Sequence, residues 1–131
     1  MTTLDERKAA AKLHIDVLAE LSRQRFISPG AGQVATYQEK AEQAVDFVAA
    51  GYPEADIANY PFIHAEVQAL GGNGRQAADG ILVARSLWIM AGAAVERIRL
   101  GAKKAVMDCT TEEEVQLAVH GAIAALRALP L

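Results

Sequence analysis

Apolar residues recur at alternating intervals of three and four residues through one long stretch of the chain, from position 77 to position 109. This spacing places all of them on one side of an α-helix. At about 1.5 Å per residue the helix spans roughly 50 Å, which is longer than a domain of this size is wide. We therefore expect other helices, from this chain or a neighbouring subunit, to cover its apolar side. The positions are Ala77, Ile81, Ala84, Trp88, Ala91, Val95, Ile98, Ala102, Ala105 and Cys109.

The large members of this stripe are the predicted core residues. They are Ile81, Trp88, Val95 and Ile98. Trp88 is the only tryptophan, and we predict that it is an interior anchor of the bundle rather than a residue that stacks on a ligand.

Helical spacing, together with start and stop signals, predicts four further helices. They cover Leu4 to about Phe26, about Gly32 to Ala50, a short stretch that begins at Pro61, and the segment from Thr111 to Pro130. Thr3 is a plausible N-cap, Pro61 is a favoured first helical residue, and Thr111 with Glu114 forms a capping box. Ser28-Pro29-Gly30 and Gly71-Gly72-Asn73-Gly74 interrupt the pattern, and 54–59 is expected to be a loop or single turn.

No segment alternates apolar and polar residues as a strand would, so we predict an all-α fold of about five helices. A chain of 131 residues has the length of one domain, 1–131. Within it we expect an N-terminal docking helix (1–28), two shorter helices (32–73) and a long C-terminal antiparallel hairpin that forms a bundle (75–131).

The first helix carries two apolar stripes, which indicates that it contacts two different partners. One stripe is Ala11, Ile15, Leu18 and Ser22, and the other is Leu13, Val17 and Leu21. Ile15, Leu18 and Leu21 are the candidate residues for attachment to another protein. Tyr52, Tyr60 and Phe62 are a second candidate interface, although these aromatic side chains would also fit over the end of the bundle.

Composition favours association. Apolar residues make up 52% of the chain, but most of them are alanines and aromatic residues make up only 5%. Because an alanine removes little surface from water, such a core is weak for its size. Helical proteins of this kind often gain stability by assembly, so we expect this chain to associate.

The charge pattern does not indicate a nucleic-acid partner. The formal net charge is −3, and the nearest approach to a basic patch is Arg97, Arg99, Lys103 and Lys104, beside Glu96. We interpret these residues as a solvated helix face.

Candidate chemistry is sparse, and we predict a protein that is not an enzyme, with no catalytic residues, cofactor or metal. Cys109 is the only cysteine and lies on the apolar stripe, so it is expected to be a buried thiol. His14, His64 and His120 are far apart in sequence without metal-ligand spacing, and His120 is expected to be partly buried. The glycine-rich turn at 71–74 lacks the residues of a phosphate loop.

One alternative is a bundle that binds a small molecule through Trp88, Tyr37, Tyr60 and His64.

The N-terminus, the single cysteine and the hydropathy predict a soluble protein that is made and kept in a reducing cytoplasm. The polar N-terminus does not resemble a signal peptide, and no window reaches 18 apolar residues, so no membrane span is expected.

The order of several short motifs resembles a helical module of tailed-bacteriophage tail proteins, of the tail-fibre or tail-fibre-assembly type. The motifs run nearly the length of the chain, from about Leu18 to Leu126. They are Arg25-Phe26-Ile27, Gly32-Gln33, Tyr37-Gln38-Glu39-Lys40, Tyr60-Pro61-Phe62 with Glu66, Trp88, Glu96 to Arg99, Lys103-Lys104 and Cys109-Thr110-Thr111.

The resemblance implies a non-enzymatic structural or adaptor protein of the tail, made in the bacterial host cytoplasm and built into the virion. Tail components sit on symmetric scaffolds, so it also implies a homo-oligomer, with a trimer as the first expectation, or contacts with other tail proteins. No fibre shaft precedes the module, which favours an adaptor or assembly role over receptor contact. A tail-assembly chaperone that is absent from the mature virion is the alternative.

Overall fold

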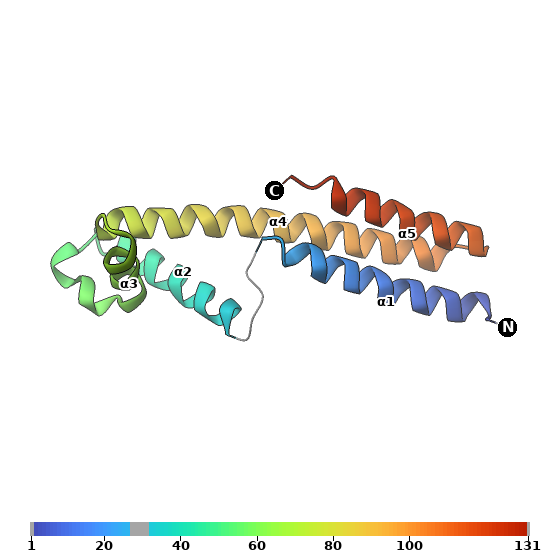
Figure 1. Cartoon of the computed structure of the whole chain (residues 1–131), viewed down its shortest axis with the longest axis horizontal. Coiled ribbons are helices and arrows are strands. Elements are labelled where there is room, and N and C mark those ends of the chain that lie inside the picture. The colour runs from blue at the N-terminus through green and yellow to red at the C-terminus, as the bar shows by residue number, and fades with distance from the viewer. Residues whose placement is uncertain (1, 27–31, 131) are drawn as a thin grey trace. The chain divides into compact units, whose positions relative to one another are not determined.

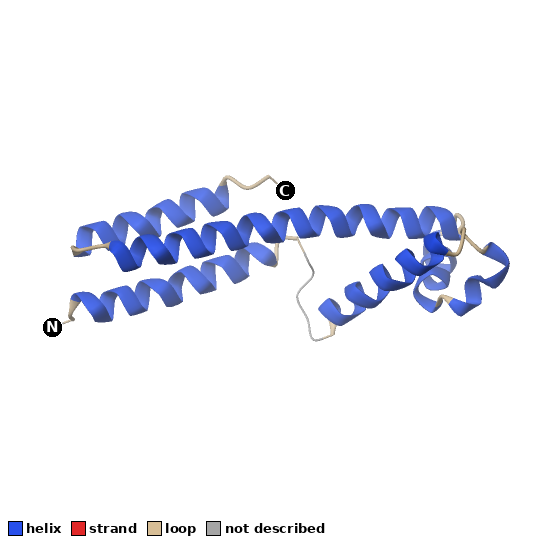
Figure 2. Cartoon of the chain, turned by 180° about the vertical axis from the view of Figure 1, so that it is seen from behind, coloured by secondary structure: helices blue, strands red, loops and turns tan. Residues whose placement is uncertain are grey.

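The computed structural model describes residues 2–26 and 32–130, and within these residues it contains helices and no strands (Figures 1 and 2). The predicted all-α fold is therefore confirmed. The elements, in chain order, are α1 (Leu4–Arg23), α2 (Gln33–Ala49), the 3₁₀ helix η1 (Glu54–Asn59), α3 (Pro61–Leu70), α4 (Gly74–Asp108) and α5 (Glu112–Arg127).

Capping groups explain where the predicted helices begin. The Thr3 hydroxyl accepts a hydrogen bond from the Glu6 amide at 3.1 Å, and the Thr111 hydroxyl accepts one from the Glu114 amide at 3.2 Å. Each bond satisfies one of the free amides in a first helical turn. The predicted caps of α1 and α5 are confirmed. The predicted stop at Ser28-Pro29-Gly30 lies outside the described residues.

The start of α4 is fixed by a carboxylate from η1. The two Glu54 oxygens accept hydrogen bonds from the amides of Gly74 and Arg75, each at 2.9 Å. Gly74 is needed because a Cβ there would lie 2.6 Å from Cζ of Phe47 and 2.9 Å from a Glu54 oxygen. The segment at 54–59, expected to be a loop or single turn, therefore holds the N-terminus of the longest helix.

The chain divides into two compact units, whereas its length predicted a single domain. One unit consists of Met1–Ser28 and Met90–Leu131, and the other of Pro29–Ile89. Both include part of α4, because a helix of 35 residues is about 50 Å long and exceeds the core that one unit of this size can form.

In the unit that contains both termini, α1 and α5 pack with the C-terminal part of α4 (Figure 1). Two buried clusters join the three segments: Ala11, Ile15, Val106, Cys109, Val115 and Ala122 form the first, and Ala19, Val95 and Leu126 form the second. Val95 is fully buried as predicted, and Ile98 is partly buried against the second cluster. The Arg25 guanidinium also donates to the Leu126 carbonyl oxygen at 3.1 Å.

In the other unit, Phe47 is the largest buried side chain, and it packs with Ala44, Ile63 and Ala78. Ile81, a predicted core residue, is partly buried against this cluster. Lys40 of α2 forms an ion pair with Glu66 of α3, which joins these two helices outside the core.

Candidate functional site

Large apolar side chains are more numerous on the surface of the described helices than in their core. Fifteen of them are exposed, whereas the fully buried large side chains are Phe47, Ile15, Ile63, Val95 and Val106. Contiguous exposed apolar surface usually marks a site of protein or membrane contact. The exposed residues are Leu13, Val17, Leu21, Val34, Tyr37, Val45, Leu70, Val83, Leu87, Trp88, Ile89, Met90, Leu100, Met107 and Leu117.

The densest group lies in α4, where every residue from Val83 to Met90 is exposed. Five of these eight residues are large and apolar: Val83, Leu87, Trp88, Ile89 and Met90. The prediction that Trp88 is a core anchor is wrong, because its side chain is 39% exposed. The stripe pattern placed it correctly on a helix, but among residues 2–26 and 32–130 its side chain belongs to none of the buried clusters.

By length and composition, α4 would be able to cross a membrane. An 18-residue window within it has a mean hydropathy of 1.4, and 11% of that window is buried. The sequence prediction of no membrane span relied on the absence of an uninterrupted apolar run, a stricter criterion than mean hydropathy. A membrane is therefore an alternative occupant of this surface that an experiment must separate from a protein partner.

The structure separates the two apolar stripes of α1. Ile15 is fully buried within its own unit, so its assignment to an interface is wrong. Leu18 is partly buried against the cluster around Val95, so most of it is also used internally. Leu21 is exposed, together with Leu13 and Val17, and of the three predicted attachment residues it alone belongs to the free stripe.

The predicted aromatic interface is largely internal to its unit. Phe47 meets Tyr60 edge to face, with ring centroids 5.1 Å apart, and Tyr52 at 6.1 Å. The Tyr52 hydroxyl also donates a hydrogen bond to Asp79 at 2.9 Å, and this bond raises the pKa of the tyrosine. Tyr52 and Tyr60 therefore close the Phe47 core, the other placement that the sequence allowed. Phe62 is half-buried, and its interface role stays a prediction.

The basic residues of α4 are not simply a solvated face, because two of them bind α1. Arg99 donates to Asp16 at 2.9 Å and to Glu96 at 2.7 Å, and Lys103 donates to Asp16 at 3.0 Å. Arg23 of α1 donates to the same Glu96 carboxylate at 2.9 Å. Hydrogen bonds from Lys103 and Arg99 lower the pKa of Asp16, and those from Arg99 lower the pKa of Glu96. Sequence reasoning missed this network because Asp16 lies more than 80 positions from its partners.

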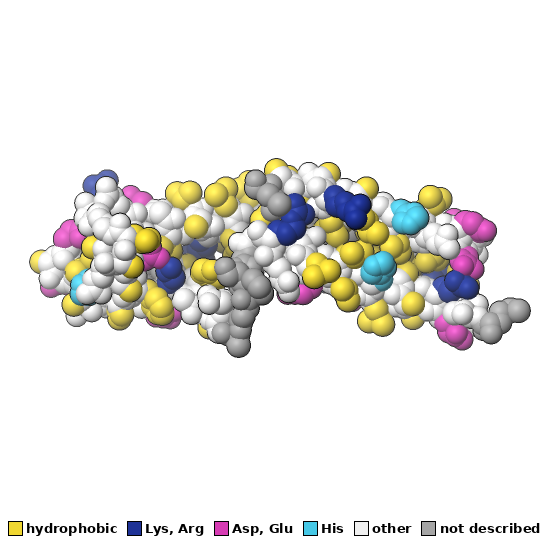
Figure 3. Space-filling model, viewed as in Figure 1, with side chains coloured by type: hydrophobic (Ala, Val, Ile, Leu, Met, Phe, Trp, Pro, Cys, Tyr) yellow, Lys and Arg dark blue, Asp and Glu magenta, His cyan; other side chains and the backbone are white. Residues whose placement is uncertain are grey.

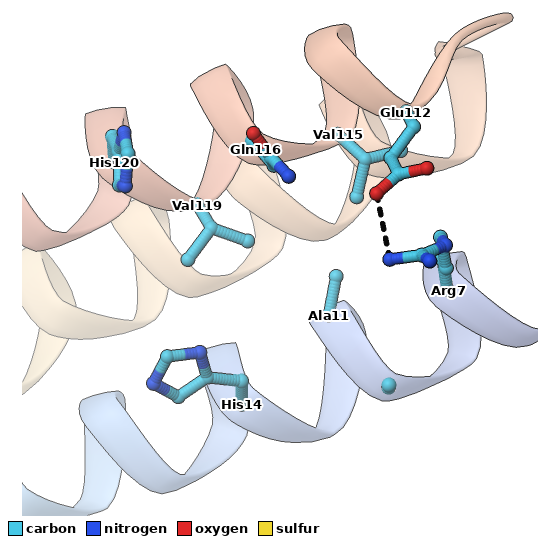
Figure 4. A pocket seen from close by; sticks show the side chains of 9 residues that line it. Arg7, Ala11, His14, Glu112, Val115, Gln116, Val119 and His120 are labelled. Atoms are coloured by element: carbon cyan, nitrogen blue, oxygen red, sulfur yellow. Dashed lines mark ion pairs between the residues drawn. The ribbon is translucent and has the colours of Figure 1, made fainter.

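A groove of about 300 Å³ runs between α1 and α5 (Figure 4). Its apolar lining consists of Ala10 and Ala11 from α1 and Val115 and Val119 from α5. Its polar lining consists of Arg7, His14, Glu112, Gln116 and His120. The four aromatic and histidine residues proposed for a small-molecule pocket do not line this groove.

Two of the charged groups in the groove pair with each other. Arg7 and Glu112 neutralise each other in an ion pair of 2.6 Å. His14 lies on the α1 wall and His120 on the α5 wall (Figure 4). Contrary to the sequence prediction, His120 is exposed.

The remaining candidate groups are structural. Cys109 is buried as predicted, and its thiol donates to the Ala105 carbonyl oxygen at 3.0 Å. Among residues 2–26 and 32–130, no group of three or more histidine, cysteine or acidic side chains is arranged to hold a metal ion.

Comparison with known proteins found no match: no family model, curated protein or solved structure is significantly similar to this chain.

Proposed function

We propose that this chain is a non-enzymatic assembly protein that acts through apolar helix surfaces, as a structural or adaptor component of a bacteriophage tail. The observation that carries the assembly role is the exposed section of α4, in which five of eight consecutive residues are large, apolar and exposed. Surface of this kind is unfavourable in water and favourable against a partner. The assignment to a phage tail rests on the order of motifs from Leu18 to Leu126.

A structural role also agrees with how the charged groups are used. The close-set acidic and basic side chains around Arg99 and Asp16 satisfy one another between α1 and α4. Such a network holds helices together and engages these charged groups with one another. We further propose that α5 returns along α4 as an antiparallel hairpin, which the shared cluster of Val106, Cys109, Val115 and Ala122 supports.

The α4 surface is tested by polar substitution. We expect Leu87→Gln with Ile89→Gln to weaken association with tail proteins at least tenfold, because both side chains are exposed on the section that we assign to the partner. Ser86→Gln is the matched control, since Ser86 lies in the same exposed section and is already polar. The readout is co-sedimentation of each variant with tail particles produced from the genome that encodes the chain.

Three outcomes are informative. Wild-type chain in a fixed ratio to other tail proteins supports a structural component. Chain that binds a tail protein before assembly but is absent from finished particles supports the chaperone role. Wild-type chain that ignores tail proteins and partitions into membranes through α4 contradicts the proposal.

A further inference from the structure

The α1 and α5 face combines a ridge with a groove. The ridge is Leu13, Val17 and Leu21, which repeat every four residues on α1 and are 67%, 57% and 55% exposed. Residues three and four apart are neighbours on a helix, so Leu13 and Val17 lie beside the groove residues Ala10 and His14. The space-filling view shows hydrophobic side chains gathered along α1 and between α1 and α5 (Figure 3).

We infer that this face binds a second copy of the same chain in a two-fold symmetric dimer, with the α1 ridge of each copy seated in the groove of the other. This inference rests on the proposed assembly function and names one of its partners. A row of side chains on one helix packs naturally into the depression between other side-chain rows. Because ridge and groove lie side by side on one surface, a two-fold axis brings each onto its counterpart at the same time.

The charges on this face fit a second copy. The ridge residues are uncharged, and Arg7 and Glu112 cancel each other at one end of the groove. Two identical faces therefore meet without net repulsion between the ridge residues and the Arg7–Glu112 pair.

The size of the face is sufficient for a dimer. α1 has 20 residues and α5 has 16, so at about 1.5 Å per residue and about 10 Å of width per helix their common face covers roughly 500 Å². Two such faces total about 1,000 Å², the size at which specific interfaces begin. We therefore expect a dimer of moderate affinity.

The test compares two double variants by light scattering. Leu13→Lys with Leu21→Lys adds two charges to the ridge. Leu100→Lys with Leu117→Lys adds the same charges at leucines that are 54% and 69% exposed and lie outside the ridge and the groove lining. At about 100 μM we expect wild type and the control to approach the mass of two 13.9 kDa chains, and the ridge variant to keep the mass of one. Circular dichroism verifies that each variant remains helical.

A third variant tests the groove. Gln116→Lys places a charge in the groove, and Gln68→Lys makes the same change at an exposed position of α3. We expect the first to raise the dimer dissociation constant at least tenfold and the second to leave it unchanged. A wild-type chain with the mass of one or three chains, or equal effects of ridge and control variants, would overturn the dimer. None of these outcomes decides the proposed function, which the α4 variants and tail particles test separately.

Discussion

The two apolar faces of α1 differ in an unexpected way, since the smaller side chains are inside and most of the larger ones are outside. The buried face carries Ala11, Ile15, Ala19 and Ser22, whereas the exposed face carries Leu13, Val17 and Leu21. Small residues let α1 approach its neighbours closely, and Ile15 supplies most of the buried volume. A face of larger apolar residues that the unit leaves in water is best explained by contact with another molecule.

The largest difference between the two faces of α1 is expected when one residue on each face is truncated. We expect Ile15→Ala to lower the free energy of unfolding by about 2 to 5 kcal/mol, because it removes a fully buried side chain and leaves a cavity. Leu13→Ala is expected to change it by less than about 0.5 kcal/mol, because the side chain already contacts water. Urea unfolding at concentrations where the chain is monomeric measures both. Similar losses at the two positions would contradict the assignment of the faces.

Enlarging a side chain also tests whether one face of α1 is closely packed and the other is open to solvent. Ala19 is fully buried, so Ala19→Leu is expected to overpack the cluster around Val95 and to lower the free energy of unfolding by about 1 to 3 kcal/mol. Val17→Leu, on the exposed face, serves as the control and should be neutral in the monomer. A neutral Ala19→Leu variant would mean that this face of α1 is not closely packed.

The N-cap of α1 stabilises the helix as a whole and belongs to neither face. A variant without the cap is therefore expected to lose stability without losing association. Thr3→Ala removes the hydrogen bond to the Glu6 amide, and we expect a loss of about 1 kcal/mol in the free energy of unfolding. The dimer dissociation constant should stay unchanged, because Thr3 belongs to neither the ridge nor the groove lining. Thr3→Ser, which keeps the cap, should behave as wild type in thermal unfolding.

The smallest expected effect is a change in the pH dependence of Tm, caused by Asp16 on the charged side of α1. Because Lys103 and Arg99 hold the folded-state pKa of Asp16 below its ordinary value, the carboxylate stabilises the fold above about pH 4, and this contribution is lost as pH falls through the folded-state pKa. Asp16→Asn lacks this contribution. We expect the difference in Tm between wild type and Asp16→Asn to be largest near neutral pH and to shrink toward pH 3. A difference that grows on acidification would contradict the network.

Local signals in the sequence were sufficient to predict the helices. Thr3, Pro61 and Thr111 mark starts that the structure confirms, because a cap or a missing amide acts within one turn. The break at 71–74 is also confirmed, since α3 ends at Leu70 and α4 begins at Gly74.

Residue contacts across the fold could not be predicted in the same way. Both stripes of α1 are apolar, so periodicity alone could not show that Ile15 faces inward and Leu21 outward. Trp88 lies on the predicted stripe of α4, yet its burial depends on whether another helix covers that section. The pairing of Asp16 with Arg99 and Lys103 likewise depends on how α1 packs against α4, which a single sequence does not contain.

The most direct test is the solution mass of the full-length wild-type chain in a dilution series up to about 100 μM, a range that captures micromolar dissociation constants. We predict a concentration-dependent equilibrium between one and two 13.9 kDa chains, which would show that the apolar face of α1 is used between copies. A mass of one chain at every concentration would contradict that claim.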